Sequence, residues 1–262
     1  MPILQRTRSI EDRGPTLLRS VAPGVHRLSH AHTNSYLIED GDALTIVDAL
    51  FPTTWRVLQR ALDAIGFRPA QVRALVLTHA HFDHLGVARR MQTEWDLPIW
   101  AHPYEGFIAR HPYRYAHENP RSFYPIRHPK AIPILSAMTA AGAWNVRGVE
   151  GLSWFSAGDT LEVPGRPVVV FSPGHTFGHS ALHLPDRNAL ITGDALVTLD
   201  PYTGETGPRI VAGAATADSR EAMGSLEVLA ATGARLVLPG HGVPWREGIG
   251  AAVTAARAAG PA

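Results

Sequence analysis

The sequence predicts a layered α/β sandwich in which helices cover two inner sheets. Short apolar runs alternate with helical patterns, and this mixture occurs in two similar halves. No Gly/Ser linker, heptad repeat or low-complexity tract divides the 262-residue chain, which is long enough to bury a large core. We therefore expect one domain over residues 21–262, preceded by an arm over residues 1–20.

The first half is expected to begin with three strands and to continue with helices and strands in alternation. A helix is predicted over residues 53–65, because apolar residues recur every three or four positions before Gly66 and Pro69 end it. The same spacing predicts a second helix over residues 84–95. The predicted strands cover residues 25–28, 35–39, 44–47, 74–77 and 98–101.

The second half repeats this pattern. Asp218 is followed three residues later by Glu221, a capping box that predicts a helix running to Gly233. A final helix is expected over residues 247–259. The predicted strands cover residues 159–163, 167–171, 181–184, 189–192 and 235–238.

Residues 102–150, between the two halves, form an aromatic-rich insertion without a clean strand period. Such long irregular segments are usually functional or disordered, and the aromatic content argues against disorder. We expect helices and loops that form a lid or wall over a site. The alternative is that most aromatic residues of the insertion pack against the sandwich. The candidate pocket residues are Tyr104, Phe107, Tyr113, Tyr115, Phe123, Tyr124 and Trp144.

Composition excludes several classes of protein. The formal net charge of +1 argues against a nucleic-acid partner. No uncharged apolar run approaches the ~20 residues that span a bilayer, and the N-terminus has no secretory signal, so we expect a cytoplasmic protein without a membrane partner. The absence of cysteine excludes disulfides, thiolate-bound zinc, iron–sulfur clusters and thiol nucleophiles. The 14 histidines, in contrast, favour metal or acid–base chemistry.

A dense histidine motif directly follows the predicted strand 74–77. In an extended loop, His79 and His81 point to the same side, and Asp83 and His84 fall where the next helix begins. The first pair could therefore serve one metal ion and the second pair another. The alternative is a His-rich surface turn.

Three further candidate ligands follow other predicted strands. His175, Asp194 and His241 each come two to four residues after an apolar run and directly after a glycine. Alone, each would pass for a turn residue or a hydrogen-bonded polar group. Because ligands delivered from strand ends meet at one edge of a sheet, we expect all three to complete the metal site.

These ordered motifs closely resemble those of the metallo-β-lactamase-fold hydrolase superfamily. The resemblance extends from Val21 to His241 and includes Asp48 at the end of an early strand. It implies a four-layer αβ/βα sandwich with a dinuclear site on its edge, holding two divalent ions, zinc first and iron or manganese as alternatives. By this resemblance, the first ion is held by His79, His81 and His175, the second by Asp83, His84 and His241, and both by Asp194.

This ligand set implies hydrolysis by a metal-bridging hydroxide, since two divalent ions activate water and polarise a carbonyl. Asp83 is expected to orient the nucleophile and carry its proton. Asp48 is expected to hydrogen-bond a ligand imidazole, with a strand-end turn as the alternative. His179 is expected beside the ligands or the substrate, with a purely structural histidine as the alternative.

Departures from known relatives narrow the substrate. The presence of Asp194 and the lack of a signal argue against β-lactam hydrolysis, and the 21 residues after His241 are too few for the glutathione-binding domain of glyoxalase II enzymes. Val197 stands where homoserine-lactone lactonases often carry tyrosine, which weakens that activity without excluding it. We expect a hydrolase acting on an ester, lactone or thioester of a small, partly apolar molecule.

Two other functions compete with this one. A mononuclear iron oxidoreductase of the persulfide-dioxygenase type could use part of the same ligand set. A non-catalytic binding protein on the same fold is the other alternative, although no predicted ligand is missing. The sequence favours no particular oligomeric state.

Overall fold

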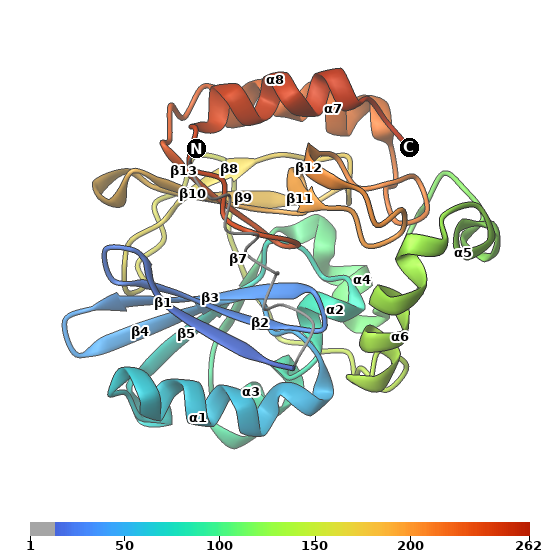
Figure 1. Cartoon of the computed structure of the whole chain (residues 1–262). Helices are drawn as coiled ribbons and strands as arrows, with labels where there is room; N and C mark the ends of the chain where they lie inside the picture. The colour runs from blue at the N-terminus through green and yellow to red at the C-terminus, as the bar shows by residue number, and fades with distance from the viewer. Residues whose placement is uncertain (1–13) are drawn as a thin grey trace, which may run out of the picture.

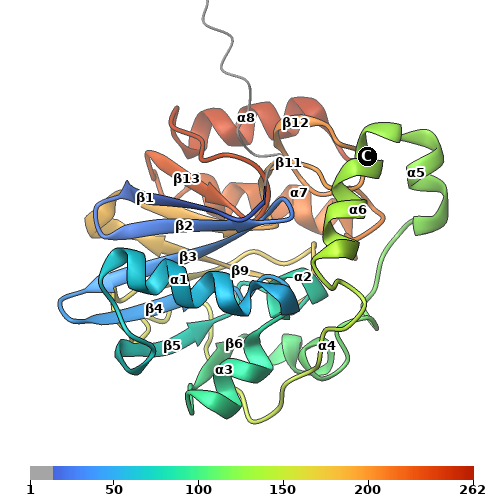
Figure 2. The same ribbon diagram turned by 60° about the horizontal axis from the view of Figure 1, so that its bottom comes forward.

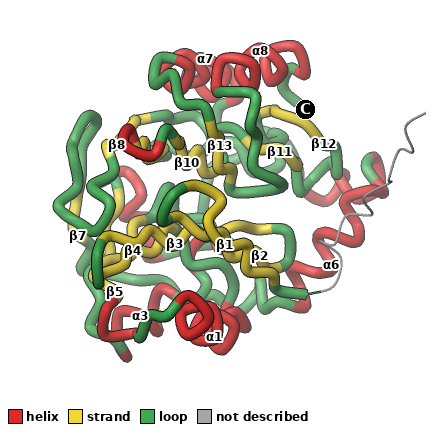
Figure 3. The backbone as a smooth tube through the Cα atoms, turned by 60° about the vertical axis from the view of Figure 1, so that its left-hand side comes forward, coloured by secondary structure: helices red, strands yellow, loops and turns green. Residues whose placement is uncertain are grey.

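Two β-sheets lie face to face in the computed structural model, which describes residues 14–262, and helices cover their outer faces (Figure 1). Helices α1 (Trp55–Ile65) and α3 (Ala88–Glu94) lie on one outer face, and α7 (Ser219–Ala230) and α8 (Ile249–Ala259) lie on the other. The predicted four-layer αβ/βα sandwich is therefore confirmed, and the layering is also visible from the side (Figure 3).

The first sheet has seven strands in chain order. Neighbouring strands are antiparallel from β1 to β4 and parallel from β4 to β7. The strands are β1 (Thr16–Ala22), β2 (Val25–His30), β3 (Thr33–Asp40), β4 (Ala43–Val47), β5 (Val72–Val76), β6 (Ile99–Ala101) and β7 (Ser153–Trp154).

The second sheet has four strands in the order β13-β10-β9-β8, and a small hairpin, β11 with β12, lies beside it. Its strands are β8 (Val168–Phe171), β9 (Ser180–Leu184), β10 (Ala189–Gly193) and β13 (Leu236–Pro239), and the hairpin comprises β11 (Val197–Leu199) and β12 (Thr206–Arg209).

Alternate side chains of each strand enter different cores, as the period of two requires. Ile46 packs in the core beneath α1 and α3, whereas its neighbour Val47 packs between the two sheets. In the second sheet, Ile191 also packs between the sheets, whereas Leu190 faces α7 and α8. Three stacked cores therefore hold the four layers together.

The directions of the strands bring the predicted ligand loops to one edge. β4 and β5 are parallel, so Asp48 and the loop after β5 emerge at the same end. In the second sheet, β9 is antiparallel to both β8 and β10, and β10 is parallel to β13. Strands β8, β10 and β13 therefore also share a direction. The loops that carry His175, Asp194 and His241 follow these three strands.

The insertion at residues 102–150 forms short helices joined by loops. Helices α5 and α6 lie beside the sandwich, next to the end that carries the C-terminus (Figure 2). The helices are α4 (Gly106–Arg110), α5 (Tyr124–Arg127) and α6 (Ile132–Ala140). Single 3-10 turns here and elsewhere are η2 (Pro52–Thr54), η3 (Pro69–Gln71), η4 (Pro103–Glu105), η5 (Arg121–Phe123), η6 (Pro129–Ala131) and η7 (Pro185–Arg187).

The helix predicted over residues 84–95 is divided into α2 (Phe82–Leu85) and α3. Between them, the backbone N–H groups of Gly86 and Val87 donate to the carbonyls of Leu50 and Ala49, at 2.8 and 3.0 Å. A Cβ atom on Gly86 would lie 2.1 Å from the Leu50 oxygen. This close backbone approach, which only glycine allows, replaces the continuous helix.

One predicted strand and one predicted boundary are wrong. Residues 159–163 form no strand: a single bridge joins Thr160 to Val168, with backbone hydrogen bonds from Val169 to Asp159 and from Leu161 to Pro167, and the chain then turns at Pro164 and Gly165. Strand β1 begins at Thr16 and pairs with β2, so the predicted arm over residues 1–20 was extended too far. Residues 1–13 of that arm lie outside the described residues.

Within residues 14–262, no helix is both long and apolar enough to cross a bilayer.

Candidate metal centre

The structure brings the seven predicted ligands together at the edge between the two sheets. The loop after β5 and helix α2 carry four of them, and the loops after β8, β10 and β13 carry one each. All seven side chains are buried: His79, His81, Asp83, His84, His175, Asp194 and His241. Residues up to 162 positions apart in the chain, from His79 to His241, thus share one polar cluster.

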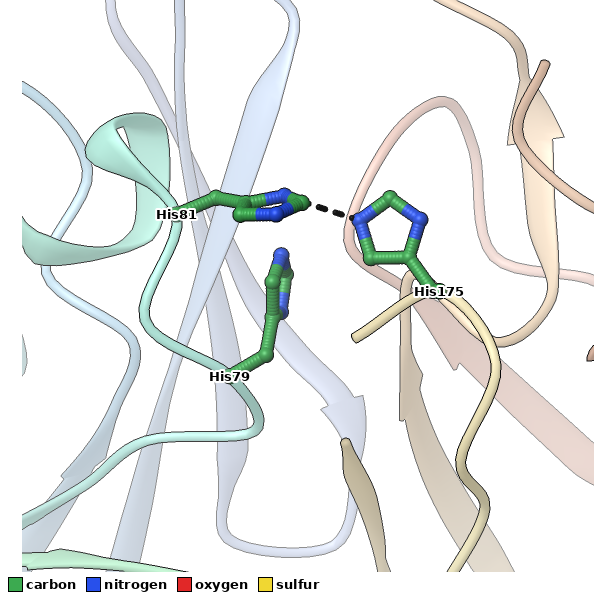
Figure 4. A group of neighbouring side chains, drawn as sticks. All are labelled: His79, His81 and His175. Atoms are coloured by element: carbon green, nitrogen blue, oxygen red, sulfur yellow. Dashed lines mark hydrogen bonds between the residues drawn. The ribbon is translucent and has the colours of Figure 1, made fainter. Parts of the chain in front are cut away.

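Three histidines form the first group. His79 and His81 extend from one loop toward His175, which approaches from the opposite sheet (Figure 4). One ligand atom from each lies within 4.8 Å of the other two, and Nε2 of His175 is 3.0 Å from Nδ1 of His81. This spacing suits three imidazoles around one cation.

The second group contains Asp83, His84 and His241, again with one ligand atom from each within 4.8 Å. The Oδ2 atom of Asp83 lies 3.3 Å from Nε2 of His241 and 3.9 Å from Nε2 of His84. A carboxylate and two imidazoles suit a second, more oxygen-rich cation site.

Asp194 lies between the two groups. Its Oδ2 atom is 3.4 Å from Nε2 of His175 and 3.1 Å from Nε2 of His241. Its Oδ1 atom is 3.5 Å from Nε2 of His84. A Cβ atom on Gly240 would lie 2.1 Å from Oδ1 of Asp194, so the glycine before His241 lets the two loops meet.

Several buried atoms of this cluster make no hydrogen bond within the described chain. Buried polar atoms are nearly always satisfied, because leaving one unpaired costs free energy. A divalent cation would satisfy these atoms together, so the residues fit a metal centre. The atoms are Nε2 of His79, His81, His84 and His241, and Oδ1 of Asp194.

The histidines of the first group are held neutral, as metal ligation requires. Burial lowers the pKa of His79 and His81 well below the usual value and that of His175 to about 3, and the neighbouring imidazoles add to this effect. Their nitrogen lone pairs are therefore available at neutral pH.

In the absence of metal, the pKa values of the histidines in the second group are raised and not lowered. Burial disfavours their charged form, but the carboxylates of Asp194 and Asp83 outweigh it for both residues, with Asp48 adding to the effect on His84. The pKa of His84 rises to about 9, and that of His241 rises well above the usual value. Both imidazoles therefore carry a proton that a metal ion would displace.

Asp48 lies where the sequence places it, beside the ligand imidazoles. Its carboxylate accepts hydrogen bonds from Nδ1 of His84 at 2.8 Å and from the backbone N–H and hydroxyl of Thr78, both at 2.8 Å. The Thr78 oxygen in turn accepts from Nδ1 of His79 at 3.1 Å. One carboxylate thus orients an imidazole of each group and leaves both Nε2 atoms facing the centre.

His179 supports the backbone of the Asp194 loop. Its Nε2 atom accepts from the N–H groups of Asp194 and Ala195 at 3.0 and 3.2 Å, and its Nδ1 donates to Ser172 at 3.0 Å. Burial lowers the pKa of His179 to about 4, which keeps it neutral and able to accept. Both ring nitrogens are used, so this side chain is a support for the ligands.

Sequence reasoning missed Glu105, which joins two ligand loops. The side chain is fully buried and accepts from the N–H of Ala80 at 2.8 Å, the N–H of Gly178 at 2.9 Å and the hydroxyl of Thr176 at 2.6 Å. Burial raises the pKa of Glu105 to about 7 against the opposing effect of these hydrogen bonds. No motif surrounds Glu105 in the sequence, so nothing there distinguishes it from a surface glutamate.

The aromatic residues of the insertion are divided between several places. Tyr113, Tyr115 and Trp144 line a cavity of about 190 Å³. Tyr124 is instead buried beside Ala212 and Ala214. The remaining three line no part of that cavity and expose more than half of their surface, so the structure does not bring all seven residues into one wall: Tyr104, Phe107 and Phe123.

Comparison with known proteins adds a family assignment to this geometry. Residues 30–241 match the model of the metallo-beta-lactamase superfamily. That range includes all seven candidate ligands, Asp48 and the whole insertion.

The chain is also similar to individual members of this group. It is 27% identical over 240 residues to the probable metallo-hydrolase YflN of Bacillus subtilis, covering 85% of both chains. It is 28% identical over 239 residues to the N-acyl homoserine lactonase AttM of Rhizobium johnstonii, covering 79% of this chain and 80% of AttM. Among solved structures, the chain has the same fold as the metallo-beta-lactamase FIM-1 of Pseudomonas aeruginosa in its mono-zinc form, with a TM-score of 0.65. The two sequences are 19% identical, and the match covers 94% of this chain and 96% of FIM-1.

Proposed function

This chain belongs to the metallo-beta-lactamase superfamily, and from this premise we propose that it is a dinuclear metal-dependent hydrolase of small esters, lactones or thioesters. One observation carries the proposal: seven buried residues with nitrogen and oxygen ligand atoms form two neighbouring groups, and Asp194 lies between them. The family assignment and the similarity to metallo-hydrolases support a metal-dependent hydrolase, and the number of ions and the substrate class are the parts proposed here.

The ligand set favours hydrolysis. Two divalent ions bound here would lower the pKa of a coordinated water and polarise a substrate carbonyl. Zinc is the ion we propose, because imidazole and carboxylate are its ordinary ligands when no thiolate is present, and iron or manganese would suit the same atoms.

The residues of the chain provide positioning and proton transfer. Asp48 and Thr78 hold the imidazoles of His84 and His79, which reduces the reorganisation needed during the reaction. Asp83 lies at the carboxylate-rich side of the cluster and is the group we assign to receive the proton of the attacking water and return it to the leaving group.

A small-molecule carbonyl substrate is supported by two observations. The similarity to the lactonase AttM favours lactones, and the mostly apolar cavity beside the ligands favours a partly apolar substrate. Tyrosine is absent at position 197, but Tyr115 and Tyr202 both line that cavity.

Metal analysis and a substrate panel test the proposal. We expect two zinc ions per chain and hydrolysis of at least one lactone, ester or thioester. Asp194→Ala should bind less of the second metal ion, and its kcat should fall by more than a hundredfold. Changes in residues that merely support ligands already lower metal affinity or activity 10- to 100-fold. Unchanged turnover in this variant would rule out the dinuclear mechanism. One iron per chain with oxygen consumption would instead support an oxidoreductase.

A further inference from the structure

An apolar cavity of about 190 Å³ lies directly beside the candidate metal centre. Phe82, which stands between the ligands His81 and Asp83, forms part of its wall, and Leu135 and Met138 of α6 form another part. A cavity of about 150 Å³ is enough to bind benzene, so this one can hold a phenyl ring or a short alkyl chain.

One cation, Arg121, lines this cavity, and no other residue of its lining is charged. The Arg121 guanidinium lies over the ring of Tyr115, with Cζ 4.1 Å from the ring centroid, and its Nε donates to the carbonyl of Ala214 at 3.0 Å. Within residues 14–262, neither a carboxylate nor any other acceptor pairs with its two terminal nitrogens. These nitrogens form a fork whose geometry matches a carboxylate.

Tyr115 connects this cation to the metal centre. The ring of His81 lies over Tyr115 at a tilt of 36°, with a centroid distance of 3.8 Å. Since Arg121 lies 4.1 Å from the same centroid and two groups this close cannot share one face of a ring, His81 and Arg121 lie on opposite faces of Tyr115. Tyr202, whose hydroxyl group influences the pKa of Tyr115, is another residue of the cavity wall. Because only one ring lies between Arg121 and the ligand His81, a substrate arm of about four to six carbons would reach from one to the other.

We propose that this cavity is a specificity site for substrates whose apolar arm ends in a carboxylate, and that Arg121 binds that carboxylate. The inference rests on the proposed hydrolase function, because the arm extends from the scissile carbonyl at the metal centre. Arg121 is a specificity-determining residue and takes no part in the bond cleavage.

A matched pair of substrates tests the selectivity. The first is the S-phenyl monothioester of adipic acid, and the second carries a carboxamide in place of its free carboxyl group. We expect the wild-type, metal-loaded enzyme to prefer the carboxylate by roughly ten- to a hundredfold in kcat/KM, the range of a charge-assisted hydrogen bond. The preference should arise from KM. Equal kcat/KM for the two substrates would overturn the proposal.

Variants assign the preference to Arg121. In Arg121→Gln the ratio of kcat/KM for the carboxylate to kcat/KM for the carboxamide should fall to about one, whereas Arg121→Lys should retain a reduced preference because the charge remains without the fork. Arg114→Gln, at an exposed arginine of the same insertion, should behave as wild type. A preference that persists in a folded Arg121→Gln protein would show that the carboxylate binds elsewhere.

A binding measurement separates this inference from the hydrolase proposal. Calorimetry should show that the metal-free protein binds 3-phenylpropionate and binds 3-phenylpropanamide more weakly. In Arg121→Gln the two compounds should bind with equal affinity. If the wild type hydrolyses neither thioester but retains this Arg121-dependent binding, the hydrolase proposal fails and the anion site stands. If both thioesters are hydrolysed equally and the two binding probes do not differ, the hydrolase stands and the anion site fails.

Discussion

A single carboxylate, Asp48, orients one imidazole in each of the two candidate ligand groups. It binds His84 directly and His79 through the hydroxyl of Thr78. Asp48 itself has a φ of 60°, a left-handed conformation that is uncommon outside glycine, although aspartate adopts it more readily than most residues. Strain of this kind persists where surrounding contacts impose it, and here the three hydrogen bonds to Thr78 and His84 do so.

Asp48→Asn should weaken metal binding by about 10- to 100-fold, because an amide accepts fewer of these hydrogen bonds and releases the tautomers of both imidazoles. Competition with a chromophoric chelator measures the dissociation constant. Asp42→Asn, in the exposed turn between β3 and β4, is the matched control and should bind metal as wild type does. Equal affinities in the two variants would contradict the orienting role of Asp48.

Metal binding at pH 7 should release protons from His84 and His241. Both pKa values are raised by the surrounding carboxylates against the effect of burial, so both imidazoles are charged before metal binds and neutral afterwards. Metal affinity therefore rises with pH until these groups have lost their protons, which for His84 is at about pH 9.

Calorimetric titration with zinc in two buffers of different ionisation enthalpy counts these protons. About two should be released per chain, and fewer in Asp48→Asn, because one of the carboxylates that raise the pKa of His84 is then removed. A heat that does not depend on the buffer would contradict the charged state of both histidines.

The loops that follow β5 and β8 are joined by Glu105. This side chain satisfies two backbone N–H groups and one hydroxyl, which would otherwise be buried without acceptors. Since one loop carries His79 and His81 and the other carries His175, Glu105 determines how the two sheets present the first ligand group.

Glu105→Ala should lower the free energy of unfolding by at least about 3 kcal/mol, since each unsatisfied buried donor costs about 1–3 kcal/mol. It should also lower metal affinity, because the two loops lose their connection. Urea denaturation of the metal-free protein measures the first effect. Glu227→Ala, at an exposed position of α7, should change stability by no more than about 0.5 kcal/mol. A Glu105→Ala protein as stable as this control would show that water replaces the carboxylate.

Elements with strong periodicity were predicted well from the sequence, and short or irregular ones were not. The central strands and helices α1, α7 and α8 were found because their apolar residues recur at the period of the element. Strands β7, β11 and β12 have two to four residues and lack the continuous apolar run that marks the equally short β6, β8 and β13. The break at Gly86 depends on the backbone of residues 49–51, which no local pattern contains.

The four layers and the metal centre stabilise each other only in part. Three apolar cores hold the layers without any contribution from the ligands. The ligands nevertheless come from both sheets, so a bound ion connects the two halves of the sandwich across their shared edge.

Removal of metal should therefore leave the protein folded but less stable. Zinc at 100 times its dissociation constant stabilises the native state by about 2.7 kcal/mol, which corresponds to an increase in Tm of roughly 5–10 °C for a chain of this size. Thermal denaturation followed by circular dichroism, with and without a chelator, measures this difference. Asp194→Ala should show a smaller increase, and loss of helical signal on chelation alone would contradict independent cores.

The amino-acid sequence was sufficient for the fold class and for the chemistry of the centre. Its alternation of apolar residues specifies which face of each strand is buried, and its His and Asp residues at strand ends specify the candidate ligands. Both are local properties, since side-chain direction and donor chemistry follow from the residue and its near neighbours.

Only the tertiary structure decided which groups surround these ligands. Glu105, Thr78 and Arg121 acquire their positions from partners on other elements, such as Ala214, which is 93 residues from Arg121. No periodicity or motif encodes such pairs, because contact across the fold depends on strand direction, loop path and the packing of the insertion. The ligands follow from the sequence, whereas their supports and the proposed anion site follow from the way the chain folds back on itself.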